Sequence, residues 1–205
     1  MAESTNIMVR TTVFHMQILL TGDLCPIPEY ITITFRLTVQ GDQKMKLRNM
    51  TGIYLSCRGQ MLLLYRQGGR VVSNQWIASA GGHFEKEELN DPKACVLREL
   101  QEELHLGEED LTDMKMRYIG LRNVNGEIRQ NYYFFANLKP EHYELFTSNE
   151  GRCKWVDYAD IMNYDMPLTA RHVMEHYLQT GQYSDCLYCA VADGQGFQFV
   201  PLPET

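Results

Sequence analysis

Residues 81–106 read GGHFEKEELNDPKACVLRELQEELHL and contain three glutamates at the spacing of one helical face. Glu99, Glu102 and Glu103 stand at positions i, i+3 and i+4, which share one side of an α-helix. Like charges at this spacing destabilise a helix by roughly 0.2–0.5 kcal/mol for each i,i+4 pair. A bound Mg²⁺ or Mn²⁺ would offset the repulsion, since both ions prefer carboxylate oxygens. The triplet therefore indicates either a metal site or a solvated acidic face.

The segment before the triplet predicts a strand, a loop and the start of a helix. Residues 76–80 are expected to form a short strand that enters a loop at Gly81-Gly82, where glycine lets the backbone approach a ligand closely. Asp91 is a good N-cap and Pro92 suits the first helical turn. The carboxylates are expected to point away from the core, because an apolar stripe occupies another side of the helix: Ala94, Leu97, Leu100 and Leu104.

Strand, glycine loop and acidic helix together resemble the Nudix box, G-x5-E-x7-R-E-U-x-E-E-x-G-U, in which U is aliphatic. Gly82 and Glu88 match its opening, and residues 98–103 (RELQEE) match R-E-U-x-E-E without a mismatch. Nine residues rather than seven separate the two halves, and His105 replaces the final glycine. A loop can absorb the two extra residues. Gly107 is expected to take over as the helix C-cap.

The resemblance implies a Nudix fold, a mixed sheet in an α/β/α sandwich, over residues 48–180. A β-rich extension at 1–47 and a hairpin at 181–205, packed on the same domain, lie outside it. The alternating patterns and turn residues predict these hairpin strands and one further helix: 50–57 with 60–66, 115–122 with 129–138, 184–191 with 196–201, and a helix near 167–179. Exposed edge strands favour pairing, so the terminal hairpins are expected to form a homodimer.

The resemblance also implies a reaction. Nudix enzymes hydrolyse a phosphoanhydride in a nucleoside diphosphate linked to another group, with water and Mg²⁺ or Mn²⁺. The implied metal ligands are the backbone carbonyl of Gly82 and a set of carboxylates: Glu99, Glu102, Glu103 and, from a distant loop, Glu150, with Glu127 as its rival. Arg98 is expected either to hold one of these glutamates or to form a plain i,i+4 pair with Glu102. Glu88 is expected to brace the loop.

A small-molecule nucleotide is the expected substrate. Arg66 and Arg129 are candidates to bind its phosphates, and ordinary ion pairs are the alternative. Trp76, with Tyr132 or Tyr133, is a candidate to stack on its base, and aromatic core packing is the alternative.

Signatures of several Nudix subfamilies are missing. Leu121 stands where ADP-ribose hydrolases have proline, and no SQPWPFPxS stretch indicates NADH cleavage. The remaining expectation is a nucleoside triphosphate, such as 8-oxo-dGTP, although Ala170 replaces the asparagine that mutator-type members use. One alternative is an isopentenyl-diphosphate isomerase relative, but Ser79 and Ala80 stand where its cysteine is expected. The other alternative is a non-catalytic nucleotide-binding module, which is disfavoured because every box glutamate is present.

Composition is that of a soluble globular protein. The chain has 205 residues, of which 44% are hydrophobic and 22% charged, enough for a single sizeable core. A net charge of −7 argues against a nucleic-acid partner. No secretory leader and no apolar run of about 18 residues is visible, so the protein is expected to be cytoplasmic and free of membranes. The six cysteines are expected to be reduced, and the C-x-x-C of Cys186 and Cys189 lacks a second pair for zinc.

Overall fold

The chain divides into two compact units, Met1–Lys44 and Met45–Thr205. The computed structural model describes residues 12–19, 30–37, 46–67, 74–143, 148 and 150–203. In the first unit, β1 (Thr12–Leu19) and β2 (Tyr30–Leu37) form an antiparallel pair, in the alternating segments where strands are expected. No helix in the described segments is long and apolar enough to cross a membrane.

The described strands of the second unit form one mixed sheet, in the order β10-β9-β6-β7-β3-β4-β5, with β8 paired to β4. The pairs β3–β7 and β6–β9 are parallel, and the other pairs are antiparallel. The strand bounds are β3 (Lys46–Cys57), β4 (Gln60–Arg66), β5 (Gln75–Ile77), β6 (Leu111–Val124), β7 (Glu127–Leu138), β8 (Gly151–Asp157), β9 (Leu187–Ala192) and β10 (Phe197–Leu202). The described helices are α1 (Pro92–Leu104), α2 (Leu168–Gln179) and five short 3-10 turns: η1 (Lys86–Glu88), η2 (Glu108–Asp110), η3 (Pro140–His142), η4 (Ile161–Asn163) and η5 (Gly181–Tyr183).

Two tight turns fix the central hairpins where the sequence predicts them. Arg58 and Gly59 join β3 to β4, and Asn125 and Gly126 join β6 to β7. All four residues have positive φ, from 51° to 78°, as a type I′ turn requires at both central positions. Such turns match the right-handed twist of the flanking strands, so they set the register of the sheet locally.

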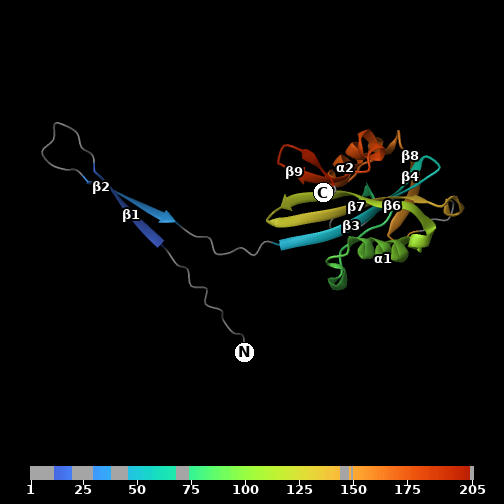
Figure 1. Cartoon of the computed structure of the whole chain (residues 1–205), viewed down its shortest axis with the longest axis horizontal. Helices are drawn as coiled ribbons and strands as arrows, with labels where there is room; N and C mark the ends of the chain where they lie inside the picture. The colour runs from blue at the N-terminus through green and yellow to red at the C-terminus, as the bar shows by residue number, and fades with distance from the viewer. Residues whose placement is uncertain are drawn as a thin grey trace, which may run out of the picture. The chain divides into compact units, whose positions relative to one another are not determined.

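The sheet is covered by α1 on one face and by α2 on the other (Figure 1). Along β3, Ile53 and Leu55 pack in the cluster that contains α1, whereas Tyr54 between them packs in the cluster that contains α2. This alternation explains why β3 is a continuous buried run, which is typical of a strand covered on both faces. Each fully buried side chain of this size contributes roughly 1.5–3 kcal/mol. The predicted α/β/α sandwich with a mixed sheet is confirmed.

Helix α1 begins as predicted and ends differently. The Asp91 carboxylate caps it by accepting a hydrogen bond from the backbone N–H of Ala94 at 3.0 Å. At the other end His105 itself adopts the left-handed conformation, with φ of 58°, and its N–H donates to the Gln101 carbonyl. Gly107 is extended and starts η2, so the expectation that it serves as the cap is wrong. Histidine is among the residues that tolerate this conformation better than most.

The apolar side of α1 is also rotated from the predicted stripe. Ala94 is exposed and Leu97 half-buried, while the buried positions are Cys95, Val96, Leu100, Glu103 and Leu104. Glu103 retains only 8% of its exposure, so the expectation that all three carboxylates point away from the core is wrong. This burial matters because a carboxylate withdrawn from water requires a partner.

Candidate active site

A cavity of about 950 Å³, called here the large cavity, lies over the α2-covered face of β3, β6 and β7. Its walls are the loop from Ala80 to Glu85, the inward side of α1 and the segment from Pro167 to Ala170 at the start of α2. The glycine loop reaches this position because it pairs with β3: the Thr51 N–H donates to the Gly82 carbonyl at 2.9 Å. The carbonyl oxygen keeps a second lone pair for another partner.

Glu99 lies directly against the glycine loop. A Cβ atom on Gly82 would collide with the Glu99 carboxylate, so only glycine permits this approach without displacing that side chain. Burial raises the pKa of Glu99 above its ordinary value, although the neighbouring Arg98 opposes the shift. Loop and helix are thus fitted to each other around a carboxylate that lines the large cavity.

Glu103 is the most perturbed carboxyl group of the site. Its Oε2 accepts a hydrogen bond from the Gly81 N–H at 3.1 Å. Burial raises its pKa to about 7, and the negative charges of Glu99 and Glu150 add to the shift. The three carboxylates therefore act on one region of the large cavity, which all three line. Arg98 and Arg66 pair with Glu99 and Glu150, but Glu103 has no ion-pair partner among the described residues, and a bound cation would relieve its negative charge.

Arg98 ties the loop to the helix. Its guanidinium donates two hydrogen bonds to the Glu88 carboxylate, at 2.7 and 3.1 Å, and this pairing lowers the pKa of Glu88 to about 2. It also lies 3.0 Å from Glu99 and 3.1 Å from Glu102. Both expectations for Arg98 thus describe real contacts, and Glu88 has the bracing position predicted for it. The bidentate geometry makes this a strong, oriented contact.

Glu102 lies apart from the other two glutamates. Its side chain is 58% exposed and turns toward Arg98, and it does not line the large cavity. Within the described segments, no three His, Cys, Asp or Glu side chains are gathered closely enough to hold a metal ion, Cys186 and Cys189 included. Of the helical triplet, only Glu99 and Glu103 face the large cavity as the metal prediction requires. Glu102 reaches it only by leaving Arg98.

The remaining charged candidates differ in whether they line the large cavity. Glu150 lines the large cavity and pairs with Arg66 at 2.7 Å. Arg129 also lines it and pairs with Glu127 at 2.9 Å. Glu127 is not part of the lining, and its carboxylate is occupied by arginines, so Glu150 has the better position for a fourth carboxylate.

The aromatic candidates are mostly packing residues. Trp76 is half-buried between Tyr65 and Tyr164, with ring centroids 5.0 and 5.1 Å apart, and it does not line the large cavity. The prediction that Trp76 binds substrate is therefore corrected to core packing. Tyr132 contacts Phe84 instead, and of the three aromatic candidates Tyr133 alone borders the cavity.

The polar residues of the large cavity that sequence reasoning missed include Arg48, Arg122 and Asn131. The position of Arg122 could have been predicted from the sequence. The Asn125-Gly126 turn sets the hairpin register and so places Arg122 opposite Arg129. The position of Arg48 depends on the parallel pairing of β3 with β7, which no local pattern reveals.

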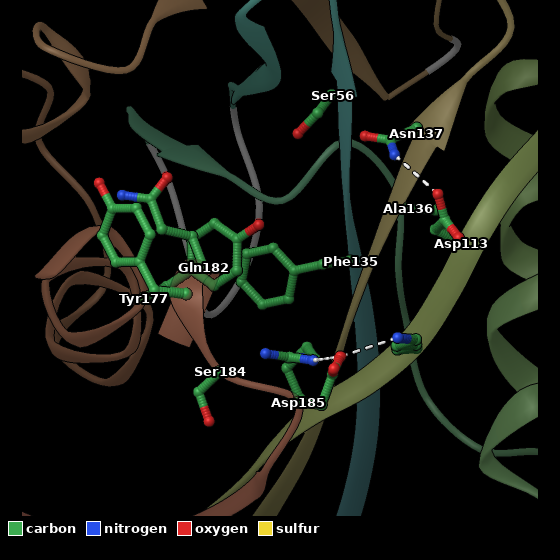
Figure 2. A pocket seen from close by; sticks show the side chains of 12 residues that line it. Ser56, Asp113, Phe135, Ala136, Asn137, Tyr177, Gln182, Ser184 and Asp185 are labelled. Atoms are coloured by element: carbon green, nitrogen blue, oxygen red, sulfur yellow. Dashed lines mark hydrogen bonds and ion pairs between the residues drawn. The ribbon is translucent and has the colours of Figure 1, made fainter. Parts of the chain in front are cut away.

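A second cavity, of about 360 Å³ and called here the small cavity, lies toward the other end of β6 and β7 (Figure 2). Phe135 stacks on Tyr177 there, with ring centroids 3.8 Å apart. Its two cations share one carboxylate: Lys115 and Arg117 lie 2.8 and 3.4 Å from Asp185. Both cations of the small cavity thus have an ion-pair partner, although the buried Nε of Arg117 has no hydrogen-bond partner.

The geometry of the large cavity agrees with comparisons to known proteins. A family model described as the NUDIX domain matches residues 45–177, well over half of the chain. The chain belongs to the Nudix family. It is therefore a Nudix hydrolase, and this family acts on nucleoside diphosphate derivatives and generally uses a divalent metal. Among curated proteins, none matches the chain.

Solved structures share the Nudix fold at low sequence identity. The MutT protein from Methanosarcina mazei Go1 is 18% identical, with a TM-score of 0.56 over 69% of this chain and 99% of that one. The mutator MutT protein from Bacillus halodurans is 20% identical, with a TM-score of 0.52 over 77% and 99% of the two chains. A Nudix hydrolase from Nitrosomonas europaea is 12% identical, with a TM-score of 0.53 over 86% and 93%. At these identities the likeness concerns the fold alone.

Proposed function

We propose that this Nudix hydrolase uses Mg²⁺ or Mn²⁺ to cleave a phosphoanhydride bond in the large cavity. One observation carries the proposal: Glu99, Glu103 and Glu150 line the same cavity, and burial, with the charges of the other two adding to it, raises the pKa of Glu103 to about 7. A buried carboxylate that is left so poorly neutralised favours a bound cation. The substrate's own phosphates would otherwise be repelled by the same three groups.

The donor set fits a hard divalent cation. The proposed ligands are all oxygens: the carboxylates of Glu99, Glu103 and Glu150, the second lone pair of the Gly82 carbonyl, and Glu102 after it leaves Arg98. When bound, the cation neutralises phosphate oxygens and lowers the pKa of water.

The protein's own basic groups position these ligands. Arg98 holds Glu88 and Glu99 at fixed distances, so it orients the loop and the helix relative to each other. Arg66 holds Glu150 at 2.7 Å and, from the cavity wall, can donate to a substrate phosphate as well. In this proposal Arg98 is a positioning residue, whereas Arg66 contacts the substrate.

The proposed substrate class is a nucleoside triphosphate or related nucleoside diphosphate derivative, cleaved to a monophosphate and, from a triphosphate, pyrophosphate. The specific candidate is 8-oxo-dGTP. Ala170 lines the large cavity without a polar group, but Asn131 offers an amide donor and acceptor in the same cavity. That amide is the group we assign to contact a purine edge.

The two rival functions meet contrary observations. Ser79, which stands in place of an isomerase cysteine, is fully buried, donates to the Leu62 carbonyl at 2.6 Å and accepts from the Leu55 N–H at 2.9 Å. It is a structural hydroxyl. A non-catalytic binding module would not require an intact set of buried glutamates.

The test is a nucleotide panel that includes 8-oxo-dGTP, incubated with Mg²⁺ or Mn²⁺, with monophosphate and pyrophosphate measured as products. We expect turnover that chelation abolishes, and a Glu99→Gln variant should lose on the order of 10²-fold or more in kcat/KM. Glu108→Gln is the matched control, because Glu108 is exposed and, among the described residues, its carboxylate pairs with Lys93 alone. Binding of nucleotide without any turnover would support the binding module and overturn the proposal.

The homodimer through the terminal hairpins stays a prediction. β10 forms one edge of the described sheet, and its hairpin exposes three apolar side chains: Val191, Val200 and Leu202. Light scattering on the eluted protein would give the mass of the assembly directly.

A further inference from the structure

Three arginines stand in one row across the floor of the large cavity. Arg48 on β3 is opposite Arg129 on β7, and Arg129 is opposite Arg122 on β6. Neighbouring strands lie about 4.8 Å apart, and residues opposite each other point to the same face of a sheet. All three side chains line the large cavity. Like charges directly opposite each other destabilise a sheet, so this arginine row requires an anion.

The protein supplies only part of that negative charge. Glu127 lies 2.9 Å from Arg129 and 3.9 Å from Arg48, and it is the one carboxylate of the described residues that pairs with the row. Arg122 has no ion pair in the described part of the chain, and its buried Nε has no hydrogen-bond partner. Three positive charges against one negative charge leave a surplus of two.

The neighbour of Arg48 does not reduce this surplus. Arg48 donates to Nε2 of His83 at 2.6 Å. An imidazole ring is either neutral or positively charged, whatever its protonation state. The hydrogen bond orients Arg48 toward the glycine loop but adds no negative charge.

The row also lies at a defined separation from the acidic groups. Gly82, against which Glu99 lies, pairs with Thr51, and Arg48 is three residues earlier on the same strand. Three strand residues span about 10 Å. Arg48 reaches back toward the glycine loop through His83, whereas Arg129 and Arg122 lie one and two strands further across the sheet, so these two arginines are the more remote from the acidic groups.

We infer that the large cavity accepts a nucleoside diphosphate derivative bearing a second anionic group, a phosphate monoester, remote from the anhydride that is cleaved. A ribose 2′- or 3′-phosphate meets this description. The charge selects phosphate over carboxylate, because a phosphate monoester carries about −1.5 to −2 at pH 7 and matches the surplus of two. Arginine forks also bind phosphate in a bidentate manner. This inference rests on the proposed function and extends it to the substrate's far end.

The experiment uses pairs of compounds that differ by one ribose phosphate: coenzyme A with 3′-dephospho-coenzyme A, and NADP⁺ with NAD⁺. With the full chain and Mg²⁺, we expect kcat/KM to be about 10- to 100-fold higher for a phosphorylated member, mainly through KM, as one charged hydrogen-bonded contact provides. A binding measurement without turnover runs in parallel. Calorimetry should show adenosine 3′,5′-bisphosphate binding more tightly than adenosine 5′-monophosphate by a similar factor.

Two variants locate the effect. Arg122→Gln and Arg129→Gln should each remove most of the preference, and Arg122→Gln should also leave kcat/KM for the dephosphorylated members within about threefold. Lys115→Gln is the matched control, because it removes one positive charge from β6 in the small cavity, and it should retain the preference. Equal rates and equal binding within every pair would overturn the inference, as would a preference that survives both arginine variants. If no nucleotide at all is hydrolysed, the proposed function fails, while the bisphosphate binding ratio still decides the inference.

Discussion

The large and small cavities share strands β6 and β7 but treat charge in opposite ways. In the small cavity, Lys115 and Arg117 both pair with Asp185, although the Arg117 Nε has no hydrogen-bond partner (Figure 2). In the large cavity, Glu99 and Glu150 pair with arginines, but Glu103 and Arg122 have no ion-pair partner among the described residues. Folding selects against unpaired charge in partly buried places. Where such charge persists, a ligand is the natural counterpart, so the unpaired Glu103 and Arg122 support the proposal that the large cavity binds the substrate.

The strongest test of this comparison is Glu103→Gln, which should lower activity and raise stability. The predicted loss of kcat/KM is on the order of 10²-fold or more, because a proposed metal ligand is removed. The stability gain follows from the pKa of about 7 against an ordinary 4.5. The folded protein holds this proton more tightly than the unfolded chain does. The stabilisation of the folded state by the protonated Glu103 carboxyl is fully present below about pH 4.5 and is lost as pH rises through 7.

In chelator, the variant should therefore match the wild type near pH 4.5 and exceed it by about 1–3 kcal/mol above pH 7. Denaturant unfolding at both pH values measures the difference. Saturating Mg²⁺ should stabilise the wild type and leave the variant nearly unchanged. A variant that is less stable than the wild type at pH 8 would show that Glu103 is a well-satisfied structural group.

A smaller effect is expected when the strained backbone conformation of His105 is relieved. His105 holds a left-handed conformation at the end of α1 and lines neither cavity. His105→Gly should stabilise the protein by about 1 kcal/mol, because glycine adopts this conformation freely. Thermal unfolding measures the gain, and nucleotide turnover should stay within about twofold. A loss of activity would mean that the His105 side chain takes part in the site.

The smallest expected effect belongs to the small cavity. Asp185→Asn removes the shared carboxylate, but Arg117 keeps its contact with the Gly181 carbonyl. Stability should fall slightly, most visibly at low salt, with turnover of every nucleotide unchanged. Thermal unfolding at two ionic strengths, compared with kcat/KM, tests both parts. A clear loss of turnover would contradict the division of roles between the two cavities.

Local sequence determines much of the fold and part of the site. The Asn125-Gly126 turn and the Asp91 cap act over a few residues, so their outcomes are readable from the chain. The same holds for Arg98, because its partner Glu102 lies one helical turn away. Motif spacing also places Glu99 beside the glycine loop.

Other features depend on packing between distant segments. The burial of Glu103 follows from how α1 rotates against the sheet, which the helical pattern alone does not fix. Trp76 packs against Tyr65 and Tyr164, which come from other parts of the chain. The alignment of Arg48 with Arg129 arises from a parallel pairing that only the assembled sheet specifies. Long-range register is thus the main information that local patterns lack.

Helix α2 borders both cavities. Its first turn, Leu168 to Ala170, forms part of the wall of the large cavity, and Tyr177 in its last turn borders the small cavity. A helix of this length is a stiff rod of roughly 18 Å. A tilt of α2 about its middle that widens one cavity therefore also displaces the wall of the other. The helix couples the shapes of the two cavities.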